Sequence, residues 1–367
     1  MTRKLPAQLL GCVLVFGTAS VHAAAVASDG SDGAYIATVG SNVIDLTLAG
    51  REDGVLNFTT ITVPFGATVT FKRNAANTPV YLAATGAINI FGTIDVSARG
   101  GFAGPGGGEG GAGGFGDAAC TASACHPAEA GGGVLGGNAG PNASVGGIKS
   151  TPGHAGSGGG MATPGLAADP ARFSASAPAT AALASLPDPL SGGSGGGGGG
   201  GWMFFGVELG GGAGGDGGGA LQLSTPGEIV LGGSLLANGA NGSWGFTNSG
   251  GTGGPGGGGS GGNLQLMGGG ITVLDTAVVN AVGGWGGCLS TEPCDSNRPA
   301  FSKLNNGGLG FLDLTARQMT LGALANLQAV AVVHPVPLPG GLALFMPALF
   351  ALAALCRHTH SNAMSGR

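Results

Sequence analysis

The sequence predicts an all-β protein: a parallel β-helix, or solenoid, with long glycine-rich insertions. Apolar residues alternate along residues 80–101, and the same pattern recurs at 221–242, 264–284 and 312–327. Recurrence of one strand pattern indicates a repeat architecture. Glycine accounts for 83 of the 367 residues, which is about three times its usual share. Charged residues make up only 8% of the chain, and no Gly-X-Y period of the collagen type is present.

The repeats keep glycines as well as apolar residues at matching places. Gly86 and Gly92 of the first copy correspond to Gly227 and Gly233 of the second. Alternate residues of a strand point to the same side, so each copy turns one apolar row toward an interior that a neighbouring copy must cover. A β-sandwich is the alternative, but it gives no reason for the copies to preserve glycine.

The chain before the first repeat is expected to join the same body. A polar, turn-rich segment contains one short strand at 43–48. Residues 56–71 then alternate between apolar residues and threonine, and the turn Pro64-Phe65-Gly66 divides them into two strands. We therefore expect one elongated body over residues 25–335.

Residues 102–219 interrupt this body as a glycine-rich insertion with almost no alternation. Two structures suit such a composition. Glycine-rich segments behave as flexible linkers, or they pack as extended strands of the polyproline II type, in which glycine permits close approach. The sequence leaves both open.

Residues 1–24 have the pattern of a secretory signal peptide. Arg3 and Lys4 precede an apolar run at 9–16, and small residues follow as far as Ala23. Because the apolar run is too short to span a membrane, we expect cleavage and export.

Residues 336–367 form a second targeting segment. The sequence VPLPG at 336–340 precedes an apolar, candidate transmembrane segment at 341–355, which Arg357 follows. This arrangement resembles the PEP-CTERM sorting signal of Gram-negative bacteria. The residues that carry the resemblance are Val336, Pro337, Leu338, Pro339, Gly340 and Arg357.

The resemblance implies passage through the secretion machinery, transient association with the inner membrane, recognition by an exosortase and removal of the tail. The body would then reach the cell surface or the exopolysaccharide. A simple C-terminal membrane anchor is the alternative. The segment 28–101 also resembles the opening of secreted bacterial glycine-rich β-solenoid proteins, which implies architecture more than activity.

Four cysteines lie between the two targeting segments, as the pairs Cys120 with Cys125 and Cys288 with Cys294. In an exported protein we expect them to form two local disulfides. The sequence CTASACH, in which His126 follows Cys125, admits a widened haem attachment site as an alternative, although the usual spacing is C-x2-C-H.

No metal or other cofactor is expected. Calcium is the alternative, because GGAGGD at 211–216 matches the start of a calcium-binding nonapeptide repeat and because Asp29 and Asp32 lie close together. Calcium takes six or more oxygen ligands, and neither segment supplies so many.

The chain is not expected to be an enzyme or to bind nucleic acid. The outward positions of the first two repeats carry no stack of acidic residues of the kind that glycosidases use, and no Gly-Lys-Ser/Thr phosphate loop is present. The net charge of −5, with 13 basic residues in all, offers no basic stripe for a phosphate backbone.

The tryptophans are the candidate binding residues. Trp202, Trp244 and Trp285 lie in or beside glycine-rich segments, where they would stack on sugar rings or pack against their own scaffold. We expect a non-enzymatic, exported surface or extracellular-matrix protein with a structural or adhesive role in an exopolysaccharide or biofilm. The alternative is a protein that binds or acts on the exopolysaccharide itself.

Overall fold

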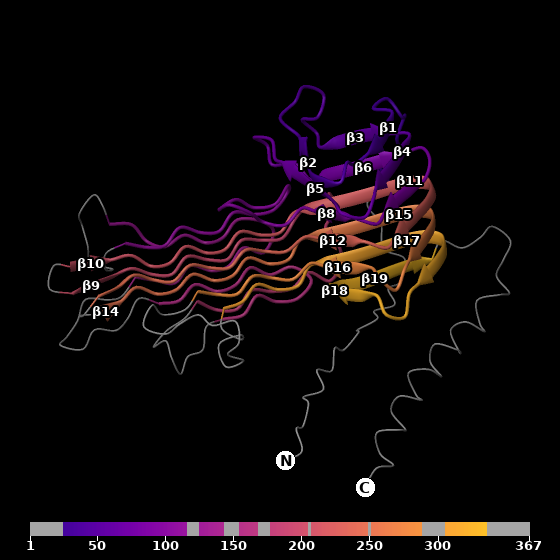
Figure 1. Cartoon of the computed structure of the whole chain (residues 1–367). Coiled ribbons are helices and arrows are strands. Elements are labelled where there is room, and N and C mark those ends of the chain that lie inside the picture. The colour runs from indigo at the N-terminus through magenta and orange to yellow at the C-terminus, as the bar shows by residue number, and fades with distance from the viewer. Residues whose placement is uncertain are drawn as a thin grey trace, which may run out of the picture.

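The computed structural model describes residues 25–115, 125–142, 154–167, 177–204, 207–248, 251–287 and 305–335. These residues form strands, turns and extended segments, and none of them lies in a helix. Figure 1 shows two parts, a body of stacked strands and a bundle of long extended segments that projects from one side of it. We call them the two-sheet body and the glycine bundle.

The strands have the following bounds. They are β1 (Ala34–Ile36), β2 (Gly40–Asp45), β3 (Val55–Phe58), β4 (Thr60–Val63), β5 (Ala67–Lys72), β6 (Val80–Ala84), β7 (Ile88–Ile90), β8 (Thr93–Asp95), β9 (Trp202–Phe204), β10 (Val207–Leu209), β11 (Ala220–Leu231), β12 (Ser234–Leu236), β13 (Thr247–Asn248), β14 (Gly251–Thr252), β15 (Asn263–Val273), β16 (Val278–Asn280), β17 (Phe311–Leu321), β18 (Asn326–Gln328) and β19 (Val330–Pro335).

The two-sheet body consists of parallel strands. Sheet A follows the order β1-β4-β7-β11-β15-β17-β19, with β3 and β6 beside this path, and sheet B follows the order β18-β16-β12-β8-β5-β2. The chain passes from sheet A to sheet B at successive corners, for example from β4 to β5 across the turn predicted at 64–66. An all-β body of parallel sheets is compatible with the predicted β-helix, whereas the strands of a β-sandwich would pair antiparallel.

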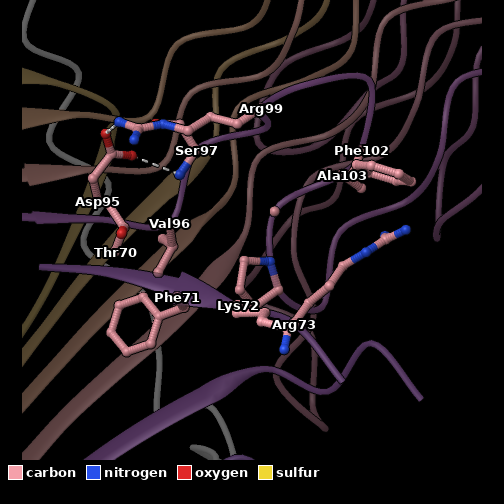
Figure 2. Close-up of a pocket in the computed structure, with 12 residues that line it drawn as sticks. Thr70, Phe71, Lys72, Arg73, Asp95, Val96, Ser97, Arg99, Phe102 and Ala103 are labelled. Atoms are coloured by element: carbon pink, nitrogen blue, oxygen red, sulfur yellow. Dashed lines mark hydrogen bonds and ion pairs between the residues drawn. The ribbon is translucent and has the colours of Figure 1, made fainter. Parts of the chain in front are cut away.

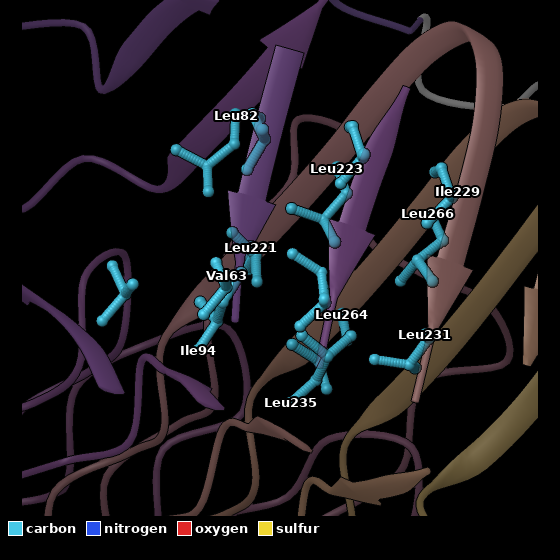
Figure 3. Close-up of a cluster of buried hydrophobic side chains, with 14 of the residues drawn as sticks. Val63, Leu82, Ile94, Leu221, Leu223, Ile229, Leu231, Leu235, Leu264 and Leu266 are labelled. Carbon is cyan, nitrogen blue, oxygen red and sulfur yellow. The ribbon is translucent and has the colours of Figure 1, made fainter. Parts of the chain in front are cut away.

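The repeats stack in register. Leu221 pairs with Val80, Leu264 pairs with Leu221, and Leu312 pairs with Leu264. All four side chains are at most 1% exposed, and Figure 3 shows leucines and isoleucines of successive strands in one interior. Each fully buried aliphatic side chain of this kind contributes about 1.5–3 kcal/mol. The interior row expected from the alternation is therefore confirmed.

The glycines shared by the repeats lie where the chain changes direction. β11 pairs with β6 over its first part and with β7 over its second, and Gly227 lies between these parts. Gly92 and Gly233 lie at corners between the sheets, where added methyl groups would overlap the carbonyl oxygens of Ala67 and Gly92, respectively. The repeats preserve glycine at these corners because the stacked chain passes too close for a side chain.

The outward positions of sheet A are more buried than the sequence suggested. Gln222, Gln265 and Asp313 alternate with core leucines, yet each is at most 3% exposed. Gln222 Nε2 donates to Gln265 Oε1 (2.6 Å), and Gln265 Nε2 donates to Asp313 Oδ2 (3.0 Å). The backbone N–H of Val26 donates to Gln222 Oε1 (3.0 Å). The segment at Val26 bonds to the edge of this face, and the buried polar side chains bond to one another.

The glycine bundle is built from extended segments that run side by side. Neighbouring segments exchange backbone hydrogen bonds at every third residue: Gly196 N donates to Gly215 O, and Gly199 N donates to Gly212 O, each at 2.8 Å. Three residues per turn is the period of the polyproline II helix. The bundle comprises residues 103–115, 126–142, 154–160, 191–201, 210–219, 238–246, 253–262, 282–287 and 305–310.

This arrangement resolves the two alternatives for the glycine-rich segments. They pack as extended strands, and segments after residue 219 join those of the predicted insertion. The far end of the bundle carries two short antiparallel pairs, β9 with β10 and β13 with β14.

Residues 191–201 lie at the centre of the bundle. The N–H groups of Gly195, Gly196 and Gly197 donate to three different segments, and their carbonyl oxygens accept from two further segments and again from 126–142. The six partner residues are Gly132, Gly215, Ser157, Gly137, Gly111 and Gly257. At each of these three glycines an added methyl group would overlap a carbonyl oxygen of a neighbouring segment.

We predict that Gly199→Ala destabilises the protein and that Gly210→Ala does not. A methyl group at Gly199 would overlap the carbonyl oxygen of Gly254, whereas one at Gly210 would meet Phe246 at 3.4 Å and Phe115 at 3.5 Å, which is ordinary contact. Overpacking of this kind costs roughly 1–3 kcal/mol. Thermal and denaturant unfolding of the two variants measures the difference. Equal stabilities would contradict the close-packed bundle.

Candidate binding surface of the glycine bundle

Charged residues surround the base of the bundle, where it leaves the two-sheet body. Arg73 forms an ion pair with Glu109, and its guanidinium lies over the ring of Phe102, 4.8 Å from the centroid. Arg99 pairs with Asp95, which also accepts a hydrogen bond from the N–H of Ser97 (2.8 Å). Arg73, Asp95, Arg99 and Phe102 are among the residues that line a cavity of about 290 Å³ (Figure 2).

These charged side chains form ion pairs where the bundle meets the two-sheet body. Glu109 lies in the bundle and Arg73 follows β5, so their ion pair joins the bundle to the body. Lys72, which also lines the cavity, pairs with Asp45 of β2 at 2.9 Å. The base is therefore a polar joint in which each basic side chain already has an acidic partner.

A second carboxyl group, that of Asp216, lies beside Glu109 at this joint. Asp216 Oδ1 accepts a hydrogen bond from the N–H of Gly110 (2.8 Å), and both carboxyl groups line a groove of about 460 Å³. Burial opposes the charged form of Glu109, but Arg73 and the N–H of Ala103 together hold its pKa below the usual value. Burial raises the pKa of Asp216, and the hydrogen bond and charge of Glu109 raise it further.

No sequence pattern indicates this pair, because the two residues lie on different bundle segments that only the tertiary structure brings together. Paired carboxyl groups are a feature of general acid–base catalysis. Here Arg73 and the Gly110 N–H engage them within the joint, which favours a structural role.

One face of the bundle is formed by the segments 103–115, 210–219 and 238–246. Gly214 N donates to Gly111 O, and Ser243 N donates to Ala213 O, each at 2.8 Å. Glutamate, alanine and phenylalanine follow one another at every third residue of the first segment, as Glu109, Ala112 and Phe115. Because every third residue of such a strand points the same way, this face runs from the charged base to an aromatic end.

Two phenylalanines mark the aromatic end of this face. Phe115 and Phe246 lie on either side of Gly210, since a methyl group there would meet a ring carbon of each. Phe246 is 65% exposed, and Phe115 stacks on His126 with ring centroids 6.5 Å apart. Both rings therefore lie beside Gly210 at this end of the face.

The three predicted tryptophans have different environments. Trp244 is 60% exposed and Trp285 is 44% exposed, but Trp202 is only 2% exposed. Trp285 N donates to the side-chain oxygen of Asn241 (2.8 Å), and Gly242 N donates to Trp285 O (2.8 Å), so the two exposed tryptophans lie on adjacent segments. Trp244 and Trp285 are therefore available to a ligand, whereas Trp202 packs inside its own scaffold.

The remaining predicted site residues are only partly described. Cys125 is disulfide-bonded, while Cys120, Cys288 and Cys294 lie outside the described residues. The sorting motif 336–340 with Arg357, and the apolar segment 341–355, also lie outside them. In the part of the chain that is described, no helix has the length and apolar character needed to cross a membrane.

The aspartates considered for calcium bond to backbone amides. Asp29 Oδ1 accepts from Ser31 N (2.9 Å), and Asp32 Oδ2 accepts from Asn57 N (2.6 Å). Asp216 of the GGAGGD sequence faces Glu109 instead of a loop of oxygen ligands. Among the described residues, no three His, Cys, Asp or Glu side chains group closely enough to hold a metal ion.

Comparison with known proteins adds no assignment to this geometry. No protein-family model matches the chain, and neither a characterised protein nor a solved structure shows significant similarity to it. The functional argument therefore rests on the residues and contacts described above.

We predict that Asp216→Asn stabilises the protein at pH 7. The amide keeps an acceptor for Gly110 N–H and removes the repulsion with Glu109. The pKa of Asp216 is raised in the folded protein, so the native state binds this proton more readily than the unfolded chain does. Protonation of Asp216 at low pH therefore removes the repulsion in the wild-type protein. The stabilising effect should therefore shrink as the pH falls through the pKa of Asp216.

Thermal unfolding at pH 7 and pH 4 measures this effect. Glu129→Gln is the matched control, because Glu129 lines the same groove and is exposed. A gain for Asp216→Asn that is absent at pH 7, or equal at both pH values, would contradict the proposed repulsion.

Proposed function

We propose that the chain is a non-enzymatic, exported surface or extracellular-matrix protein in which a β-solenoid body holds a rigid glycine bundle. The observation that carries the proposal is the hydrogen-bonded packing of the bundle, together with the exposed aromatic residues it displays. A flexible glycine linker would leave such residues without fixed positions. Here Trp244, Phe246 and Trp285 sit on segments that bond to their neighbours at every third residue.

The solenoid part of the proposal rests on the stacking of the repeats. The chain passes repeatedly from a strand of sheet A to a strand of sheet B. Both strands of one passage pair in parallel with those of a neighbouring passage, as β4 and β5 do with β7 and β8. Such a body grows by adding repeats and exposes long, regular sides. A scaffold of this type suits a structural or adhesive role in an exopolysaccharide or biofilm.

The exported location is supported by the sequence features at both ends. Residues 1–24 have the pattern of a secretory signal, and 336–340 resembles the PEP-CTERM motif that an exosortase recognises. β19 ends at Pro335, so the proposed sorting motif begins directly after the last strand of the body. Removal of the tail would thus leave the two-sheet body complete.

Carbohydrate binding by the bundle is the second candidate function. Trp244 and Trp285 are exposed on adjacent segments, and Asn241 lies between them as a polar neighbour. Exposed aromatic rings that are held in place lose little conformational entropy when a sugar ring stacks on them. This surface would retain the protein on the exopolysaccharide.

The intact mass of protein recovered from the native cell surface tests the proposed processing. We expect a mass that lacks both terminal segments and that rises on reduction by two hydrogen atoms for each of two disulfides. Recovery with the C-terminal segment still present would contradict sorting by an exosortase. An added haem mass would contradict the disulfide assignment of Cys120 and Cys125.

The double variant Trp244→Ala/Trp285→Ala tests carbohydrate binding by the bundle. Loss of two stacking rings should weaken retention on the native exopolysaccharide by about tenfold. Val43→Ala is the control, since Val43 is 64% exposed on the body. Unchanged retention of the double variant, with unchanged thermal stability, would remove the bundle as the binding surface.

A further inference from the structure

A groove crosses the corners between sheet A and sheet B, on the two-sheet body and away from the glycine bundle. It has a volume of about 750 Å³, and every residue that lines it is uncharged. Its lining includes two phenylalanines, Phe65 and Phe91, and several threonine and serine side chains. The function proposed above makes no use of this groove.

Differences in corner length form the groove. Val63 pairs with Ile90 and Thr68 with Thr93, so residues 64–67 of one corner lie beside only residues 91–92 of the next. The following corner, 232–233, is equally short, and the one after it, 274–277, is long again. Two short corners are therefore bounded by two long ones.

The spacing of the strands sets the width of the groove. The long corners follow β4 and β15, which are three strand positions apart through β7 and β11. Neighbouring strands lie about 4.8 Å apart, so the long corners are separated by about 14 Å. Gly92 and Gly233 form the floor, where their N–H groups already bond to Val63 O and Ile90 O. Because these N–H groups are already bonded, a ligand in the groove would be recognised by side chains.

The two phenylalanines provide apolar surface at the groove. Phe65 is 88% exposed on a long corner, and Phe91 is 42% exposed on a short one. A methyl group at Gly232 would lie 3.1 Å from Phe91 and 2.9 Å from Leu274, so these side chains close over the neighbouring glycine. Phe65 gains little burial from the fold, and its exposed ring is available for stacking.

A row of hydroxyl groups runs beside the phenylalanines. Thr68, Thr93 and Ser234 are cross-strand neighbours on the outer face of sheet B. The residues that follow them, Val69, Ile94 and Leu235, are buried in the core at no more than 1% exposure. Because side chains alternate along a strand, the three hydroxyls point outward. Each hydroxyl is both a donor and an acceptor.

We propose that this groove binds a neutral polysaccharide, with Phe65 stacked on a sugar ring and the hydroxyls of Thr68, Thr93 and Ser234 bonded to sugar hydroxyls. An uncharged lining of aromatic rings and hydroxyl groups matches the alternating C–H faces and O–H edges of a neutral sugar. An acidic polymer would find no cation among the lining residues, and a peptide strand would find the backbone of the floor already bonded. The inference deepens the carbohydrate-binding function considered above and places it on the body.

Binding of cellohexaose, maltohexaose and laminarihexaose to the purified full chain tests the proposal, with hexagalacturonate as the charged comparison. We expect calorimetry to detect at least one neutral hexasaccharide and no tighter binding of the charged one. Phe65→Ala and Thr93→Val should each weaken the binding by about tenfold, through loss of the stacked ring and of a hydroxyl bond. Thr93→Val keeps the side-chain shape on a strand, and Phe65 is too exposed to affect folding.

Two controls separate this site from the bundle. Val43→Ala should leave the hexasaccharide affinity unchanged, and Phe65→Ala should weaken it by the same factor in the Trp244→Ala/Trp285→Ala background, where the bundle no longer contributes stacking rings. Failure of all three neutral sugars to bind, tighter binding of hexagalacturonate, or unchanged affinity in both groove variants would overturn the proposal. A loss confined to the tryptophan variant would place binding on the bundle instead. Cell-surface recovery of Phe65→Ala should equal that of the wild type, so a failure of the exported location would be seen separately.

Discussion

The backbone hydrogen bond between glycine segments is the interaction on which the bundle depends. A strand of the polyproline II type has no hydrogen bonds of its own, so each N–H and C=O must bond to a neighbour. Residues 195–197 bond in this way to six residues of five surrounding segments. At many positions the segments approach too closely for a Cβ, as the overlap expected at Gly199 shows. The high glycine content is thus a packing requirement.

The two-sheet body supplies the order that glycine alone lacks. Glycine loses more conformational freedom on folding than any other residue, and an isolated bundle would have to offset that loss without an apolar core. Segments 210–219 and 253–262 lead into β11 and β15, and segment 238–246 follows β12. The interior side chains of these strands, such as Leu235 and Leu264, are almost fully buried. The Arg73–Glu109 ion pair adds a contact at the joint. The body therefore fixes the near end of each of these segments.

The exposed aromatic residues follow from the same geometry. In a strand with three residues per turn, a central segment has no free side, whereas a segment at the surface has positions that face solvent. Phe115, Phe246 and Trp244 occupy such positions, and the bundle holds them at a fixed distance from the body. On the body itself, a difference in length between corners makes a groove where the strands are otherwise regular. One candidate binding surface thus arises from the three-residue period of the bundle, and the other arises from unequal corners in an otherwise regular body.

The sequence by itself determined the stacked strand repeats, because alternation and shared glycines are local patterns that survive in every copy. The register of Val80, Leu221, Leu264 and Leu312 is the one that this pattern predicts. The sequence did not decide whether the glycine segments are flexible linkers or packed extended strands, since a residue without a side chain shows no pattern of burial.

Only the tertiary structure decided which residues are exposed and which of them come together on one surface. Trp202 is buried while Trp244 is exposed, although both lie in glycine-rich sequence, because exposure depends on a segment's place in the bundle. The Glu109–Asp216 pair and the groove at Phe65 likewise bring together residues from separate segments. Sequence periodicity determines which side of a strand a residue faces, and the packing of distant segments determines what lies on that side.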